Sequence, residues 1–133
     1  MTEDVNEHRP IPRGDAFAAP YWDALREGRF VLPRLVTGEF ISPTRAIPAA
    51  EVEWVPAPRS GTIASFSWVH IQPSPGYVEQ LPYVLATVRL DAGPQLMCNI
   101  VATAPDDVAI GRRVELVTER RAEGWVVAQF TVV

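Results

Sequence analysis

Apolar and polar residues alternate along most of the second half of the chain, which is the pattern of half-buried β-strands. Four segments show it, at residues 83–90, 95–102, 112–118 and 125–133. The turn signal DAGP lies between the first two, so we expect a hairpin there. The side chains expected to face one common interior are Val84, Ala86, Val88, Leu90, Leu96, Cys98, Ile100, Ala102, Val114, Leu116, Val126, Ala128, Phe130 and Val132.

The segment 61–71, GTIASFSWVHI, predicts a longer, strongly bent strand because it is rich in β-branched and aromatic residues. Strict alternation gives this strand two faces that both contain apolar residues, so the strand is expected in a closed or covered sheet. One face holds Ala64, Phe66, Trp68 and His70, and the other holds Ile63, Ser65, Ser67, Val69 and Ile71.

The first half of the chain has shorter patterns. Residues 18–29 predict a helix with Pro20 in its first turn and Gly28 at its end. An apolar stripe of Tyr21, Trp22 and Leu25 must dock on another surface, because so short a helix is marginal alone. Residues 30–54 hold short apolar pieces separated by Pro and Gly, which is typical of tight hairpins. Such a small knob needs a metal or a neighbouring surface to hold it.

The order of these elements predicts the fold class. Residues 104–110 predict a short helical turn ended by Gly111, so the chain reads as three strands, a helical turn and two strands. That order is the order of an OB-fold, a small Greek-key barrel. We therefore expect a mainly β protein with a flexible arm at 1–15, a helix at 16–30, a small hairpin region at 31–56 and a five-stranded barrel at 57–133.

Composition narrows the function. The 133 residues include 12 basic and 16 acidic side chains, giving a net charge of −4, and lysine is absent. This balance argues against a general nucleic-acid binder, although Phe66, Trp68 and Tyr83 could form a stacking platform for single strands. The sequence has neither a signal-peptide pattern nor a membrane span, so we expect a cytoplasmic protein. The single cysteine, Cys98, is expected to be a buried and inert thiol.

Catalytic motifs are missing from the sequence. No phosphate loop, HExxH motif or nucleophile elbow is present, and there are only two histidines. His70 lies on the long strand, where a structural or groove-lining role is favoured over acid–base work. Asp106 and Asp107 are explained by a helix start, where the helix dipole favours acidic residues.

The ordered set PYWDALREGRFVLPR, SPTRAIP, EVEW, GTIASFSWVH, LPYVLATVRLD and IGRRVEL resembles the acyl-CoA-associated OB-fold proteins called domain of unknown function 35. The resemblance covers residues 18–132 and implies a helix, a rubredoxin-like zinc ribbon and an OB barrel. The four cysteine positions of the family's ribbon fall on Arg34, Thr37, Ile47 and Ala50, none of which binds zinc as a thiolate. We therefore expect a degenerate ribbon that has lost its zinc and holds no other cofactor, with apolar packing of Leu35, Phe40, Ile47 and Val52 in its place.

The resemblance also implies a function. Family members accompany thiolase-like enzymes, aldolases of lipid-transfer-protein type and MaoC-like enoyl-CoA hydratases, so this chain is expected to be a non-catalytic accessory subunit of an acyl-CoA-processing hetero-oligomer, in steroid, aromatic or fatty-acid metabolism. The alternatives are a stand-alone acyl-CoA-binding module and, less favoured, a nucleic-acid-binding OB domain. The candidate residues for the CoA or partner surface are Tyr21, Trp22, Arg45, Arg59, Trp68, His70, Tyr77 and Arg89.

Overall fold

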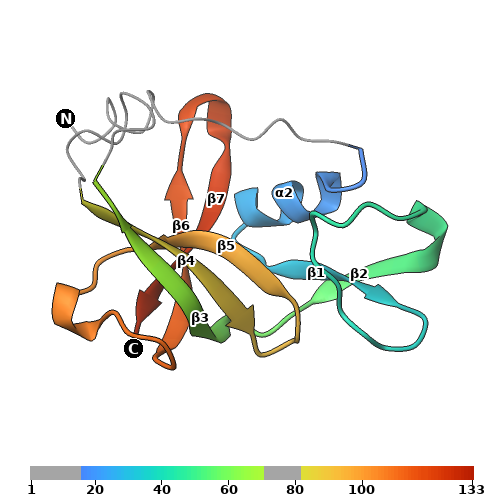
Figure 1. Ribbon diagram of the computed structural model, residues 1–133. Helices are drawn as coiled ribbons and strands as arrows, with labels where there is room; N and C mark the ends of the chain where they lie inside the picture. Colours follow the sequence, from blue (N-terminus) through green and yellow to red (C-terminus); the bar gives the residue numbers. More distant parts are fainter. Residues whose placement is uncertain (1–15, 71–81) are drawn as a thin grey trace.

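The computed structural model describes residues 16–70 and 82–133, which form a β-barrel, a two-stranded sheet and a short helix (Figure 1). The small sheet and the helix come first in the chain: α2 (Ala19–Arg26), β1 (Val31–Leu35) and β2 (Val52–Pro56). The barrel consists of β3 (Ser60–Val69), β4 (Tyr83–Leu90), β5 (Gln95–Ile100), β6 (Arg113–Arg120) and β7 (Val126–Val132). Three 3-10 turns complete the described structure: η1 (Ala49–Glu51), η3 (Pro105–Asp107) and η4 (Ala122–Gly124).

The barrel closes in the strand order β3-β4-β5-β7-β6, which confirms the predicted mainly β fold with a five-stranded OB barrel. Its pairs are antiparallel except for β5 and β7, which run parallel and meet at Ile100 and Phe130. The interior is filled by side chains with almost no exposed surface, because alternate residues of all five strands point inward. The most deeply buried are Ile63, Val88, Leu90, Val114 and Phe130.

A β-bulge in β3 changes which side chains share a face. The pairing with β4 shifts between Ile63 and Ser65, so one extra residue enters the strand. Ile63 lies opposite Val88, while Phe66 lies opposite Ala86. Residues directly opposite each other point to the same side of a sheet, so Ile63 and Phe66 share the inner face. The strict alternation expected for residues 61–71 is therefore wrong at the bulge.

The end of β5 also differs from the prediction. The strand ends at Ile100, and Ala102, which was expected to face the interior, is exposed with a φ of 49°. Beyond the strand, the Val101 N–H donates to the carbonyl of Phe130, and the Thr103 hydroxyl accepts from the Val132 N–H. The chain turns away from the barrel here because Ala102 adopts a left-handed conformation.

The helix α2 ends as its sequence predicts. Gly28 has a φ of +78°, its N–H donates to the carbonyl of Leu25, and the Arg29 N–H donates to the carbonyl of Ala24. This pair of bonds is a Schellman motif, in which glycine accepts the left-handed conformation at low cost. Leu25 is buried, and α2 contacts both β1 and β7 (Figure 1). The helix thus joins the small sheet to the barrel.

The small sheet contains two antiparallel strands, with Leu35 opposite Val52 at its outer end. The third apolar piece of this region forms only a single bridge, between Arg34 and Phe40. Its core lies near α2 and the barrel, where Leu32 and Ile41 are buried. No helix in the described part of the chain is long and apolar enough to cross a membrane. The predicted arm at 1–15 lies outside the described residues.

Candidate binding groove

A groove of about 760 Å³ lies where the helix α2, the segment 42–44 and the outer face of the barrel meet. One wall is α2, with Tyr21 and Trp22, and a second wall is the segment 42–44. The floor is the outer face of the β4–β5 hairpin and part of β7. This volume lies within the range of small-molecule sites, roughly 300–1,000 Å³.

The floor of the groove is apolar where an outer barrel face is ordinarily polar. Leu85 and Met97 lie on adjacent strands as diagonal neighbours, since Leu85 pairs with Asn99 and Thr87 pairs with Met97. The Met97 side chain is 73% exposed. A large exposed apolar side chain on a barrel wall is a feature of surfaces that contact a ligand or another protein.

Four of the polar side chains that line the groove are bonded to one another in pairs. The hydroxyls of Ser42 and Thr44 lie 2.7 Å apart in a hydrogen bond. Gln129, which is 4% exposed, accepts the Asn99 N–H at 2.7 Å and donates its amide to the Asn99 side-chain oxygen at 3.3 Å. Asn99 in turn donates to the carbonyl of Val84. These amides replace ladder hydrogen bonds where β5 and β7 meet at only one residue pair.

Of residues 16–70 and 82–133, the one charged side chain on the lining of this groove is Arg121, which is ion-paired with Glu119 at 3.1 Å. The two side chains are 10% and 17% exposed, so the pair is largely withdrawn from water. The groove therefore presents a wall of low net charge.

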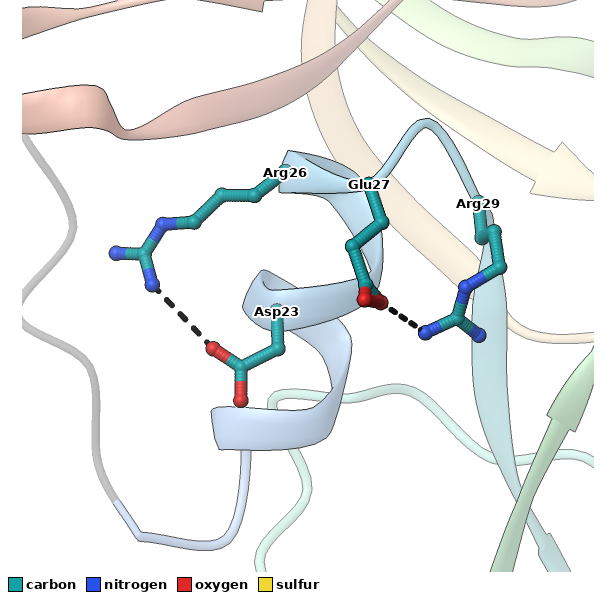
Figure 2. A network of polar contacts seen from close by, with 4 residues as sticks. All are labelled: Asp23, Arg26, Glu27 and Arg29. Atoms are coloured by element: carbon teal, nitrogen blue, oxygen red, sulfur yellow. Dashed lines mark hydrogen bonds and ion pairs between the residues drawn. The ribbon is translucent and has the colours of Figure 1, made fainter.

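Aromatic and cationic contacts fix α2 beside the groove. The rings of Trp22 and Trp125 meet edge to face at 5.7 Å, and the Arg26 guanidinium lies 4.3 Å from the centre of the Trp125 ring. Arg26 also donates to Asp23 at 3.3 Å, and Arg29 bonds Glu27 at the end of the helix (Figure 2). The wall that carries Trp22 is thus held in one position.

The Tyr21 hydroxyl and the Cys98 thiol are both kept protonated by burial. Desolvation raises the pKa of Tyr21 well above its usual range, and the nearby Cys98 adds to the shift. Burial raises the pKa of Cys98 to about 12, because a thiolate would lose its hydration. A neutral thiol of this kind is a poor nucleophile, which agrees with the expectation for Cys98.

The structure separates the predicted surface residues. Tyr21 is only 6% exposed and belongs to the core cluster, although part of its side chain also lines the groove. Trp22 is half-buried on the groove, and Trp68 is 36% exposed on β3. His70 is exposed just after β3. Tyr77 lies outside the described residues.

The three candidate arginines lie apart from the groove. Arg45 is exposed and lines a second, smaller pocket of about 420 Å³ beside the β4–β5 turn. This pocket shares Ser42 with the groove. Arg59 donates to the carbonyl of Gly28, and Arg89 is exposed near the end of β4.

The stacking platform considered for single-stranded nucleic acid does not form. Phe66 and Trp68 lie opposite the inward-facing residues Ala86 and Val84. Tyr83 lines the groove on the outer face instead. The three rings therefore lie on two faces of the sheet.

The four positions that correspond to the family's zinc ligands lie in β1 and in the segment between β1 and β2. None of them carries a side chain that binds zinc. Arg34 is ion-paired with Glu53 at 3.6 Å and its guanidinium lies 5.9 Å from the ring of Phe40. Thr37 and Ala50 are exposed, and Ile47 is half-buried. Within residues 16–70 and 82–133, no three His, Cys, Asp or Glu side chains gather as a metal site would require. These residues do not fit a zinc ion.

Sequence reasoning missed the residues that form the groove. Leu85 and Met97 occupy outward positions of strands whose alternation was clear, so two large apolar residues on an outer face were a usable signal. Asn99 and Gln129 gave no such signal, because their pairing depends on β5 and β7 becoming neighbours.

The fold is an OB barrel with a groove on its outer face, beside the helix α2 and the segment 42–44. The family model described as the C-terminal OB-fold domain of ChsH2 matches residues 54–119. A solved chain of the Ltp2-ChsH2(DUF35) aldolase superposes with a TM-score of 0.77 at 26% identity, covering 91% of this chain and 98% of that one.

Two curated relatives are similar to this chain in sequence. The chain is 36% identical over 73 residues to a DUF35 domain-containing scaffold protein of Methanocaldococcus jannaschii, covering 55% of this chain. It is 31% identical over 113 residues, 81% of this chain, to a probable enoyl-CoA hydratase alpha subunit of Thermomonospora curvata. The chain spans 51% of the first relative and 35% of the second. It belongs to the DUF35 family of OB-fold proteins.

Proposed function

We propose that this chain is a non-catalytic accessory subunit of a cytoplasmic hetero-oligomer that processes an acyl-CoA ester. The observation that carries the proposal is the likeness, over nearly the whole of both chains, to the DUF35 chain of an aldolase. The described residues support a binding role, since the groove beside α2 is lined by apolar side chains together with polar side chains, four of which bond one another. A thiolase-like, aldolase or hydratase partner would supply the chemistry.

The proposal includes a contact with the CoA ester. Arg45 is the candidate for its phosphates, because it is exposed on a pocket adjacent to the groove and is always charged. An arginine there offers several donors in a planar fork that suits phosphate oxygens.

Co-expression tests the accessory role. The tagged chain is produced alone and together with the thiolase, aldolase or hydratase encoded beside it, and the products are sized by light scattering. A stable hetero-oligomer whose enzyme loses activity or solubility without this chain is the expected result. A monomer that leaves the neighbouring enzyme unaffected would contradict it.

A second candidate function is a stand-alone acyl-CoA-binding module. The groove favours it, because its volume of about 760 Å³ suits a small-molecule ligand. The two functions differ in their dependence on a partner: a module binds the ester fully when alone, and no heat in calorimetry with acyl-CoA would exclude it.

A further inference from the structure

The charge distribution around the groove restricts what it can hold. A CoA ester has an anionic nucleotide end and a neutral acyl end. Among the described residues, the one charged side chain on the lining is Arg121, which is ion-paired with Glu119. Phosphates would meet only this paired cation on the described lining, whereas a neutral group meets no unfavourable charge there.

The hydrogen-bonding groups lead to the same restriction. Ser42 and Thr44 bond each other, and Asn99 and Gln129 exchange hydrogen bonds through their amides. A ligand that bonded these four side chains would have to displace their present contacts, which leaves Tyr83, Thr87 and Gln95 as other polar side chains of the lining. An apolar group does not, and it covers the exposed surface of Met97, which removes apolar area from water.

We infer that the groove between α2 and the β4–β5 hairpin binds the neutral acyl part of the thioester, and that the phosphates remain outside it. The floor formed by Leu85 and Met97 contacts the acyl chain, and Trp22 forms the wall. The shared residue Ser42 marks the exit toward Arg45, where the anionic end would lie. This inference rests on the proposed acyl-CoA function and specifies which part of the ester this chain holds.

The test uses thioesters without phosphates. Octanoyl and acetyl thioesters of N-acetylcysteamine, together with free CoA, are titrated into the purified chain while tryptophan fluorescence is followed, since Trp22 lines the groove. The octanoyl thioester should bind at least roughly tenfold more tightly than the acetyl thioester, because its extra methylene groups become buried. Free CoA should not compete with it.

Matched variants locate the binding. Met97→Glu should weaken octanoyl thioester binding at least roughly tenfold, because a carboxylate then replaces part of the apolar floor. Met97→Leu keeps an apolar side chain there and should bind the thioester as the unchanged chain does. Ile110→Glu is the control, since Ile110 is 69% exposed, comparable to Met97, and does not line the groove. Both charged substitutions lie at exposed positions, and circular dichroism checks that each variant is folded.

Three results would overturn the inference: no octanoyl thioester binding, binding unchanged in Met97→Glu, or full competition by free CoA. Each is distinct from failure of the proposed function. A chain that forms the hetero-oligomer but ignores the octanoyl thioester keeps the accessory role and loses the acyl groove. A chain that binds the thioester but forms no complex keeps the groove and loses the accessory role.

Discussion

Gly61 lies where β3 approaches β4 so closely that no side chain fits. A Cβ at this position would be 2.5 Å from the carbonyl oxygen of Arg89 and 2.8 Å from a methyl carbon of Val88. Both distances are too short for non-bonded atoms, so an added methyl group must push the two strands apart. Glycine is therefore required here by packing and not by an unusual φ.

We predict that Gly61→Ala lowers the free energy of unfolding by about 2 kcal/mol, the usual cost of overpacking a rigid core. Urea denaturation measures it. Ser67→Ala on the exposed side of the same strand should change stability little and serves as the control. An unchanged urea midpoint for Gly61→Ala would mean that the strands separate at no cost.

Cys98 and Tyr21 make stability sensitive to high pH. Burial raises the pKa of Cys98 from an ordinary value of 9.0 to about 12, so the unfolded chain loses this proton first as the pH rises. The folded state then binds more protons than the unfolded state, and stability falls with increasing pH. The chain has no lysine, so the ionisation of Cys98 and Tyr21 in the unfolded chain accounts for this fall in stability at high pH.

We predict that the free energy of unfolding falls above about pH 9, by up to about 1.4 kcal/mol per pH unit for each ionising group. Urea midpoints between pH 7 and 11 measure it. Cys98→Ala should give a shallower decline, because only the tyrosine contribution remains. Equal slopes in both proteins would show that the thiol ionises freely in the folded state.

At the scale of elements, the helix α2 depends on the contacts of its side chains with the barrel, because it would not be stable alone. The helix has eight residues and no side-chain N-cap, and helices of this length are marginal alone. Trp125 contacts both Trp22 and Arg26 from the η4 turn side of the barrel. This single ring therefore determines how firmly the groove wall is held.

We predict that Trp125→Ala destabilises the docking of α2 by about 2 kcal/mol, through loss of an aromatic pair and a cation–π contact. Hydrogen exchange should show faster exchange of the α2 amides, while the amides of β4 stay protected. Trp68→Ala removes a tryptophan away from the helix and should leave α2 unchanged. If the α2 amides still exchange slowly in Trp125→Ala, contacts other than those of Trp125 hold the helix to the barrel.

At the scale of the whole molecule, the small sheet and its connecting loop are joined to the barrel by apolar contacts. Phe40 and Trp54 pack against the core cluster, and the Ala57 N–H donates to the carbonyl of Phe30. Of the four residues expected to replace the zinc, Leu35, Ile47 and Val52 are half-buried away from that cluster, and only Phe40 reaches it. We expect that attachment to the barrel contributes the stability that a free-standing ribbon would need from a metal.

We predict that purified protein contains no stoichiometric zinc and that a chelator leaves its melting temperature unchanged. The reason is that Arg34, Thr37, Ile47 and Ala50 supply neither thiolate nor imidazole. Elemental analysis and thermal melts with and without EDTA measure both quantities. One tightly bound zinc per chain would contradict the prediction.

The sequence by itself determined the order of the elements along the chain, the helix and its glycine end, because local patterns of alternation and turn residues specify them. Residues 83–90 agree with β4, and the OB order followed from the spacing of the segments. The candidate site was predicted less completely, since Tyr21, Trp22 and Arg45 line the two pockets while Arg59 and Arg89 lie apart from them.

Only the tertiary structure decided which faces meet. The bulge after Ile63 reversed the alternation of β3, a change that depends on its pairing with β4. The groove exists because α2, the segment 42–44 and the β4–β5 hairpin converge, although they are distant in sequence. Local propensity fixes the elements, but long-range contacts fix their register and the cavity between them, and a single chain's pattern does not encode those contacts locally.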